Sequence, residues 1–242
     1  MKKGLLTIIA AMLTGAVCAD LTGYEKTISS PADGGAGPAL WYKSGAQRSA
    51  NDLHILNSGS AGASYTAHHL AAALSADLWG NANMAFLGDP YVPGVSGSSG
   101  LFTTGEKGTV SFLFKTPATI PDTRPLLFSQ GATFKVLLNI NGKIRIDHVN
   151  GGTKYIDVVS VKTDTWYYFA MKWDTSRRRG GLRWYLGEAD GRLRTGTLAI
   201  DRAGDPYAPI QFNQAMVPMQ QIAIWDRELS KESIEAQFAA IP

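Results

Sequence analysis

Cysteine is almost absent from this 242-residue chain, which contains only Cys18. This residue falls inside an N-terminal segment with the features of a leader peptide, so the rest of the chain has neither a disulfide nor a thiol nucleophile. Long apolar runs are also scarce, and beyond the N-terminus no stretch is long enough to span a bilayer. Stability must therefore come from an ordinary hydrophobic core, for which the length suffices.

The chain also lacks a strong charge of either sign. Its formal charge is +3, and loss of Lys2 and Lys3 with the leader leaves 21 basic and 20 acidic residues, a net charge of +1. A nearly neutral chain argues against nucleic acid as a partner, because phosphate binding needs a concentrated positive field. With 45% hydrophobic and 18% charged residues, the composition is that of a globular protein.

Signatures of several enzyme classes are missing. The sequence has no phosphate-binding Gly-Lys-Ser/Thr loop, and the segment Gly94–Ser98 lacks the final glycine and the following helix pattern of a nucleophile elbow. No predicted strand carries acids two or four positions apart, the single-strand arrangement that would supply a retaining glycosidase with its carboxylate pair. The best acids on strands are Asp147 and Asp157. We expect Asp157 to lie near Arg145 across a hairpin, as an exposed ion pair.

The four histidines are His54, His68, His69 and His148. The adjacent side chains of His68 and His69 diverge, and no Cys or nearby Glu offers a third ligand, so no metal site is predicted. His148 lies on the apolar side of its predicted strand, where Tyr155 or Lys154 could join it as a proton-transfer set for a lyase. The structural alternative is a histidine with satisfied hydrogen bonds at a sheet margin.

The N-terminus has the arrangement of a secretory signal peptide, residues 1–19. Met1–Lys3 is basic, and Leu5–Val17 is an apolar run of about a dozen residues. Small or medium residues at the two positions that the peptidase reads predict cleavage after Ala19 and a secreted or periplasmic protein. The alternative is a lipid anchor on Cys18, but Gly15-Ala16-Val17 lacks the upstream Leu and the adjacent Gly or Ala of such sites.

Residues 20–80 are rich in Gly, Ser and Ala and show weak periodicity. We expect this segment to pack on the main domain, residues 81–242, rather than to fold alone. Short edge strands are expected at Ala39–Tyr42 and His54–Leu56, and one or two helical turns at His68–Leu74. Turn residues predict a long surface loop over Pro90–Gly108.

Strand patterns dominate residues 81–242. Alternating apolar residues predict strands at Asn83–Leu87, Thr109–Lys115, Leu126–Ser129, Phe134–Ile140, Ile144–Val149, Tyr155–Val159, Arg192–Ile200, Ile210–Asn213 and Met219–Trp225. We expect a three-residue hairpin loop at Asn141–Lys143. It pairs Ile140 with Ile144 and Leu138 with Ile146, which keeps the apolar side chains on one face.

The pattern centres on two aromatic-rich segments, Thr165–Asp174 and Leu182–Gly187. In an extended chain the first segment points apolar side chains to both faces, which predicts an interior strand of a sheet packed on a second sheet. After the last strand, Ser230 is expected to cap a short helix at Lys231–Ala240. The predicted fold is all-β, an antiparallel two-sheet jelly-roll sandwich with a short C-terminal helix.

Three segments occur in the same order as in one known family: Gly108–Phe112, Thr165–Ala170 and Met219–Ser230. On these segments the sequence resembles the laminin-G-like, concanavalin-A-like jelly-roll domains of secreted bacterial proteins. The resemblance covers about residues 83–241 and implies carbohydrate binding, or the glycoside hydrolase or lyase activity of some relatives. The family usually has Asp where Gln220 stands and Asp-Gly at the end of the strand occupied by Tyr185–Gly187. Both departures remove carboxylates, so the sequence does not support a calcium site.

The candidate ligand-binding residues are four aromatic residues and three arginines at a hairpin tip: Trp166, Tyr168, Trp184, Tyr185, Arg177, Arg178 and Arg179. Aromatic rings stack on sugars, and clustered arginines suit an acidic glycan or an anionic surface. The structural alternatives are core packing for the rings and a solvated turn for the arginines. The leading interpretation is an exported, non-catalytic module, without a cofactor, that binds a glycan or another surface component. The alternatives are a polysaccharide-degrading enzyme and a structural or adhesive envelope protein.

Overall fold

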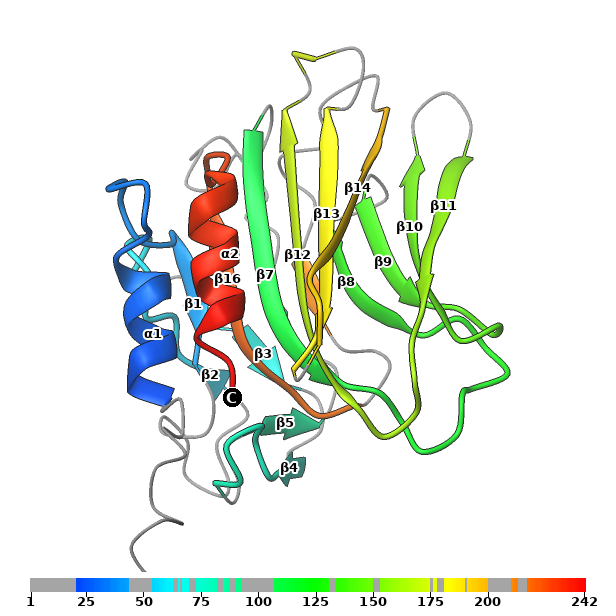
Figure 1. The fold of residues 1–242 in the computed structure, drawn as a ribbon. Coiled ribbons are helices and arrows are strands. Elements are labelled where there is room, and N and C mark those ends of the chain that lie inside the picture. The colour runs from blue at the N-terminus through cyan, green and yellow to red at the C-terminus, as the bar shows by residue number, and fades with distance from the viewer. Residues whose placement is uncertain are drawn as a thin grey trace, which may run out of the picture.

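The computed structural model of the chain forms a sandwich of two antiparallel sheets, each with eight strands (Figure 1). It describes residues 21–43, 54–62, 65, 67–69, 73–81, 85–87, 90–92, 107–130, 134–149, 153–174, 176–177, 181–189, 191–199, 210–212 and 217–242. The predicted leader, the Cys18 alternative and the Gly94–Ser98 segment lie outside these residues. Every pairing between described strands is antiparallel, as predicted. The all-β sandwich is thereby confirmed.

The two sheets draw strands from the whole described chain. Sheet A has the order β14 (Arg194–Leu198), β13 (Leu182–Glu188), β12 (Trp166–Asp174), β7 (Lys107–Lys115), β16 (Met219–Trp225), β5 (Ala85–Leu87) and β4 (Ala73–Ser75), and β1 (Leu40–Tyr42) also pairs with β16. Sheet B has the order β11 (Thr153–Ser160), β10 (Lys143–Val149), β9 (Phe134–Leu138), β8 (Leu126–Gln130), β15 (Ile210–Phe212), β6 (Pro90–Val92), β3 (Ala67–His69) and β2 (His54–Ile55). The helices are α1 (Leu21–Ser29) and α2 (Lys231–Ala239).

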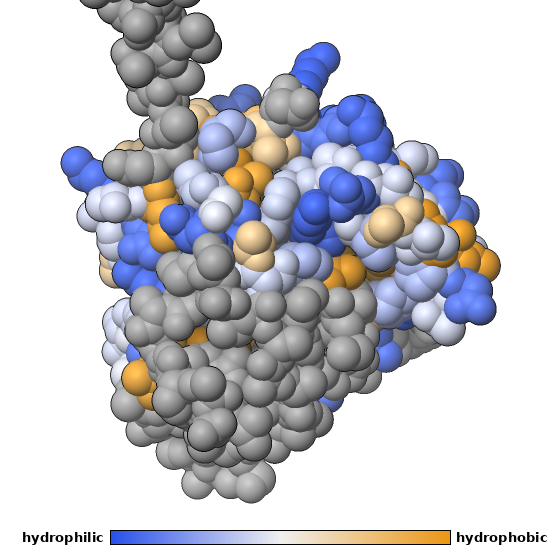
Figure 2. All heavy atoms as spheres, turned by 90° about the horizontal axis from the view of Figure 1, so that it is seen from below, coloured by the Kyte–Doolittle hydropathy of each residue, from blue (hydrophilic) through white to orange (hydrophobic). Residues whose placement is uncertain are grey.

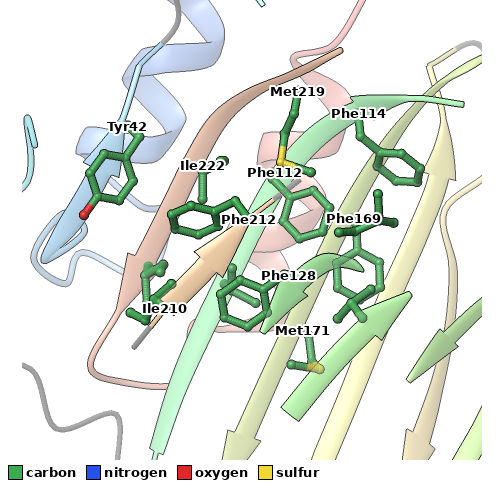
Figure 3. Packing of buried hydrophobic residues seen from close by; sticks show 14 of the residues in the cluster. Tyr42, Phe112, Phe114, Phe128, Phe169, Met171, Ile210, Phe212, Met219 and Ile222 are labelled. Carbon is green, nitrogen blue, oxygen red and sulfur yellow. The ribbon is translucent and has the colours of Figure 1, made fainter. Parts of the chain in front are cut away.

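Strand β12 is an interior strand with two buried faces, as its sequence predicts. It pairs with β7 on one side and β13 on the other. Its inward side chains join the core between the sheets, where the rings of Phe169 and Phe112 stack with their centroids 5.1 Å apart. Figure 3 shows this core, in which Phe128 and Phe212 from sheet B pack close to Phe112 and Phe169 from sheet A.

Both described helices cover the outer face of sheet A (Figure 1). Tyr24 and Ile28 of α1 and Ile234 of α2 are buried in a second apolar cluster with Tyr168 and Tyr185 of the sheet. The predicted cap of α2 is confirmed, because the hydroxyl of Ser230 accepts a hydrogen bond from the amide of Ser233 at 3.1 Å. In the described part of the chain no helix is long and apolar enough to cross a membrane.

The hairpin between β9 and β10 corrects the expected register. Leu138, not Ile140, is the partner of Ile144, so the register is shifted by two residues. The loop is longer than expected, and Ile140 is 52% exposed at its tip. The apolar set still lies on one face, because a shift of two preserves the alternation. Gly142, with φ +69°, closes the turn by donating its amide to the Asn139 carbonyl.

Several short elements also differ from expectation. The residues expected to form helical turns at His68–Leu74 lie partly in strands β3 and β4, and the expected loop after Pro90 begins with strand β6. Helix α1 has no counterpart among the predicted elements. Strands of two or three residues form because partner strands elsewhere in the chain satisfy their backbone hydrogen-bonding groups. Local sequence patterns carry no signal of these partners.

Candidate functional site

The four predicted sugar-stacking residues do not form one open surface. Trp184 belongs to the core between the sheets, and Tyr168 and Tyr185 lie in the cluster beneath α2. Burial raises the pKa of Tyr168, whose hydroxyl donates to Gln237 Oε1 at 2.9 Å. These three rings are covered by protein, which corrects their proposed role, since a covered ring cannot stack on a sugar. Trp166 is half-buried at the edge of the same cluster.

Arg177 is held by carboxylates of the protein itself. Its Nε lies 3.2 Å from Asp174 Oδ2 and its Nη2 lies 3.0 Å from Glu228 Oε2, although its side chain is 59% exposed. The arginine therefore ties the β12–β13 hairpin to the segment after β16. Arg178 and Arg179 lie outside the described residues, so a role of this tip in binding an acidic glycan stays a prediction.

The outer face of sheet B carries a polar surface, partly exposed, that the aromatic content of the sequence did not indicate. On β10, Ile144 and Ile146 are core residues, so Arg145 and Asp147 lie on the opposite, outer face. Neither described helix covers this face, because both pack on sheet A. One polar row crosses the sheet, each member directly paired with the next: Tyr155, Asp147, Lys135, Ser129 and Gln211.

The same row continues in backbone register beyond β15. Gln211 pairs with Tyr91, Tyr91 with His68, and His68 with His54, so the register spans all eight strands of sheet B. The side chains of these last three residues lie outside the described part. The same is true of His69, His148 and Lys154, so the proposed proton-transfer set is not tested. Among the described residues no group of three potential metal ligands occurs.

Tyr155 is the most exposed large apolar side chain among the described residues, at 58%. The guanidinium of Arg145 lies 3.7 Å from the centre of its ring, a cation–π contact that orients it. Arg145, only 9% exposed, donates from Nε to Asp147 Oδ1 at 2.6 Å. This arrangement corrects the expected exposed ion pair, because Arg145 faces Asp157 in the ladder but forms its ion pair with Asp147 on its own strand.

Asp157 organises a second part of this surface. Its two carboxylate oxygens accept from Asn139 Nδ2 at 3.1 Å and from Asn141 Nδ2 at 3.2 Å. Asn139 Oδ1 in turn accepts from Arg124 Nε at 3.1 Å. We call Tyr155, Arg145, Asp147, Asp157 and Asn139 the sheet B surface. It combines one aromatic ring with a fixed set of charged and amide groups, the combination that recognises sugar faces and sugar hydroxyls.

The sheet B surface does not present a pair of carboxyl groups prepared for glycoside hydrolysis. Hydrolysis requires one carboxyl group to protonate the leaving oxygen while the other acts as base or nucleophile. Here Asp147 is engaged by Arg145, and both oxygens of Asp157 are engaged by amides. The geometry suits recognition better than proton transfer.

No protein-family model matches the sequence, and no curated protein matches it. Solved structures do match. The botulinum neurotoxin serotype D binding domain is 13% identical, with a TM-score of 0.58, over 88% of this chain and 52% of that chain. A second structure concerns botulinum neurotoxin type C, whose cell entry depends on interaction with two ganglioside molecules. It is 9% identical, with a TM-score of 0.57, over 90% of this chain and 53% of that chain.

A Trypanosoma rangeli sialidase in complex with the inhibitor DANA is also similar, 13% identical with a TM-score of 0.57, over 84% of this chain and 33% of that chain. This chain therefore spans about half the length, or less, of the structures that it matches. At such identities the likeness shows the fold alone. The protein is a two-sheet, antiparallel β-sandwich.

Proposed function

We propose that the protein is an exported carbohydrate-binding module that holds a glycan on the sheet B surface. The observation that carries this proposal is Tyr155, an exposed ring stacked by Arg145 and set among hydrogen-bonding groups that are already oriented. Side chains ordered before binding lose little entropy when a ligand arrives. Aromatic stacking then supplies affinity, and the partly exposed carboxylates of Asp147 and Asp157 discriminate between hydroxyl arrangements, while the buried Asn139 holds Asp157 in place.

The similar structures support the same class of function. One of them is a neurotoxin binding domain, and another concerns a neurotoxin whose cell entry depends on two ganglioside molecules, which are glycolipids. We further infer membership of the concanavalin-A-like or laminin-G-like group, on the sandwich and on the closing strand β16 followed by the capped helix α2. Export is inferred from residues 1–19, and mass spectrometry of the mature protein tests it. An N-terminus at Asp20 is expected, whereas a lipid on Cys18 would contradict cleavage there.

A glycan array probed with the purified protein, with and without a chelator, tests the function. We expect binding that Tyr155→Ala weakens at least about tenfold, which corresponds to about 1.4 kcal/mol. Tyr155→Phe, which keeps the ring, should retain most of the affinity. Leu56→Ala is the matched control, since Leu56 is another exposed apolar residue, at 44%, away from this surface. Equal binding by all variants would refute the site.

Product analysis of any bound polymer separates binding from catalysis. The sialidase among the similar structures makes a polysaccharide-degrading enzyme the second candidate. The engaged state of Asp147 and Asp157 favours binding alone. Release of shortened or unsaturated sugars by the purified protein would overturn the non-catalytic proposal.

A further inference from the structure

A second, separate feature lies at one end of the sandwich. A cavity of about 150 Å³ opens between the end of β11, the edge strand of sheet B, and the side of sheet A that carries β12, β13 and the edge strand β14. It is lined by Val159, Ser160, Val161, Lys162, Tyr167, Leu186, Glu188, Arg192 and Arg194. Figure 2 views the molecule from below, where the uncovered surface carries hydrophilic residues in blue around smaller hydrophobic patches.

The rim of the cavity has an excess of positive charge. Lys162 Nζ lies 2.5 Å from Glu188 Oε1, so this cation and this carboxylate neutralise each other. Arg192 and Arg194 are exposed, and neither forms an ion pair within the described part of the chain. Two guanidinium groups are thus available at one opening, and guanidinium is the side chain that binds carboxylates in a two-pronged geometry.

The walls of the cavity are of a different kind. Val159, Val161 and Leu186 give it an apolar side. The hydroxyl of Tyr167 accepts from the amide of Lys162 at 2.8 Å, which fixes its position, and burial raises the pKa of this phenol. The phenol therefore stays protonated at neutral pH and keeps a donor for a ligand. Ser160 adds a second hydroxyl, and Glu188 adds an acceptor.

We propose that this cavity binds one acidic monosaccharide unit, with its carboxylate between Arg192 and Arg194 and its ring against the apolar wall. The volume supports a single unit, because sites for drug-sized ligands begin at about 300 Å³. The positively charged rim repels a metal ion. A bare inorganic anion has no apolar surface that could pack against the apolar wall. The proposal rests on the proposed function in one respect, that the natural ligand is a glycan.

The test is calorimetric titration of the full chain with glucuronate, and with glucose as its uncharged counterpart. Glucuronate is expected to bind and glucose to bind at least about tenfold more weakly, since only the first offers a carboxylate to the arginines. Arg192→Gln/Arg194→Gln should weaken glucuronate binding by about tenfold or more. The matched control is Lys26→Gln/Lys231→Gln, which removes the same charge from α1 and α2, and it should bind as the parent does.

Titrations with other anions distinguish an acidic sugar from a simple anion as the ligand. Acetate or sulfate binding as tightly as glucuronate would overturn the proposal, because the wall would then contribute nothing to recognition. Unchanged affinity in the double arginine variant would overturn it as well. Failure here is distinguishable from failure of the sheet B surface. Array binding that Tyr155→Ala weakens is expected to persist in the arginine variant, whereas glucuronate binding is expected to persist in Tyr155→Ala.

Discussion

Asp33 and Arg227, 194 residues apart in sequence, form a two-pronged ion pair with Oδ2–Nη1 at 2.8 Å and Oδ1–Nη2 at 3.0 Å. The same carboxylate accepts from the amides of Gly35 and Ser230, so it also reaches the N-cap of α2. The Asp33 amide in turn donates to Ser233 Oγ at 3.0 Å. One side chain therefore joins the segment after α1 to the beginning of α2.

Replacing this carboxylate should lower the stability of the whole sandwich. Asp33→Asn removes charge-assisted bonds to a partly buried arginine, and we expect the free energy of unfolding to fall by about 1–3 kcal/mol. Urea unfolding followed by tryptophan fluorescence measures the change. The control is Glu235→Gln, which breaks the exposed pair with Lys231 and should cost less than about 1 kcal/mol. Similar losses in both variants would contradict the special role of Asp33.

Stability should fall in acid. The hydrogen bond from Arg227 holds the pKa of Asp33 well below its usual range, and hydrogen bonds from Ser176 lower the pKa of Asp174. A lowered pKa in the folded state means that the unfolded chain takes up the proton first. The contribution is therefore complete above the unfolded value of about 3.9 and is lost as the pH falls through the lower folded value. Urea unfolding curves between pH 6 and 2 should show a fall in the free energy of unfolding. The fall should be smaller in Asp33→Asn than in the parent protein.

Gly187 lets α2 lie directly on sheet A. A Cβ at this position would come within 2.2 Å of Phe238 Cε2, so Gly187→Ala must displace that ring. We expect a loss of about 1–3 kcal/mol. In Phe238→Leu the obstacle is smaller, and a double-mutant cycle should show a coupling of at least about 0.5 kcal/mol. Strictly additive effects on the unfolding free energy would show that the ring moves away without cost.

Tyr168 should affect stability and not binding. Tyr168→Phe leaves the buried Gln237 oxygen without its donor, which should cost about 1–3 kcal/mol. Because the ring lies beneath α2, glycan affinity should match that of the parent protein. Array binding and urea unfolding of the same sample measure both quantities. A loss of binding at unchanged stability would return this residue to the ligand site.

The longer strands could be predicted because their evidence is local. In β12, apolar residues recur on both faces so strongly that the interior position of the strand follows from its own sequence, and apolar residues also predicted β7 and β16 as strands. The capped helix α2 is equally local, since Ser230 and the following turn carry the signal. Alternation also identified the apolar face of β10. It could not place the hairpin register, because registers two residues apart bury the same face.

The candidate site could not be predicted from single strands, because its residues come from several strands that are neighbours only in the folded sheet. Tyr155, Lys135 and Gln211 join one polar row only when β11, β9 and β15 take their places in sheet B. Aromatic content pointed instead to Tyr168 and Tyr185, whose rings α2 covers. Sequence patterns report how apolar a strand is, whereas exposure depends on what packs over it. The cavity near Arg192 likewise exists only where the edges of the two sheets meet.

The pairing of β1 with β16 governs how this protein reaches its folded state. Leu40 pairs with Ile224, and Trp41 pairs with Ala223. Strand β1 therefore stays unpaired on this side until β16 has been synthesised. Closing so long a loop costs entropy before any contact compensates for it, so acquisition of the native topology should be slow. A nascent chain that ends before β16 leaves β7 without one neighbour and β1 without its partner, and these bare strand edges are sites of aggregation.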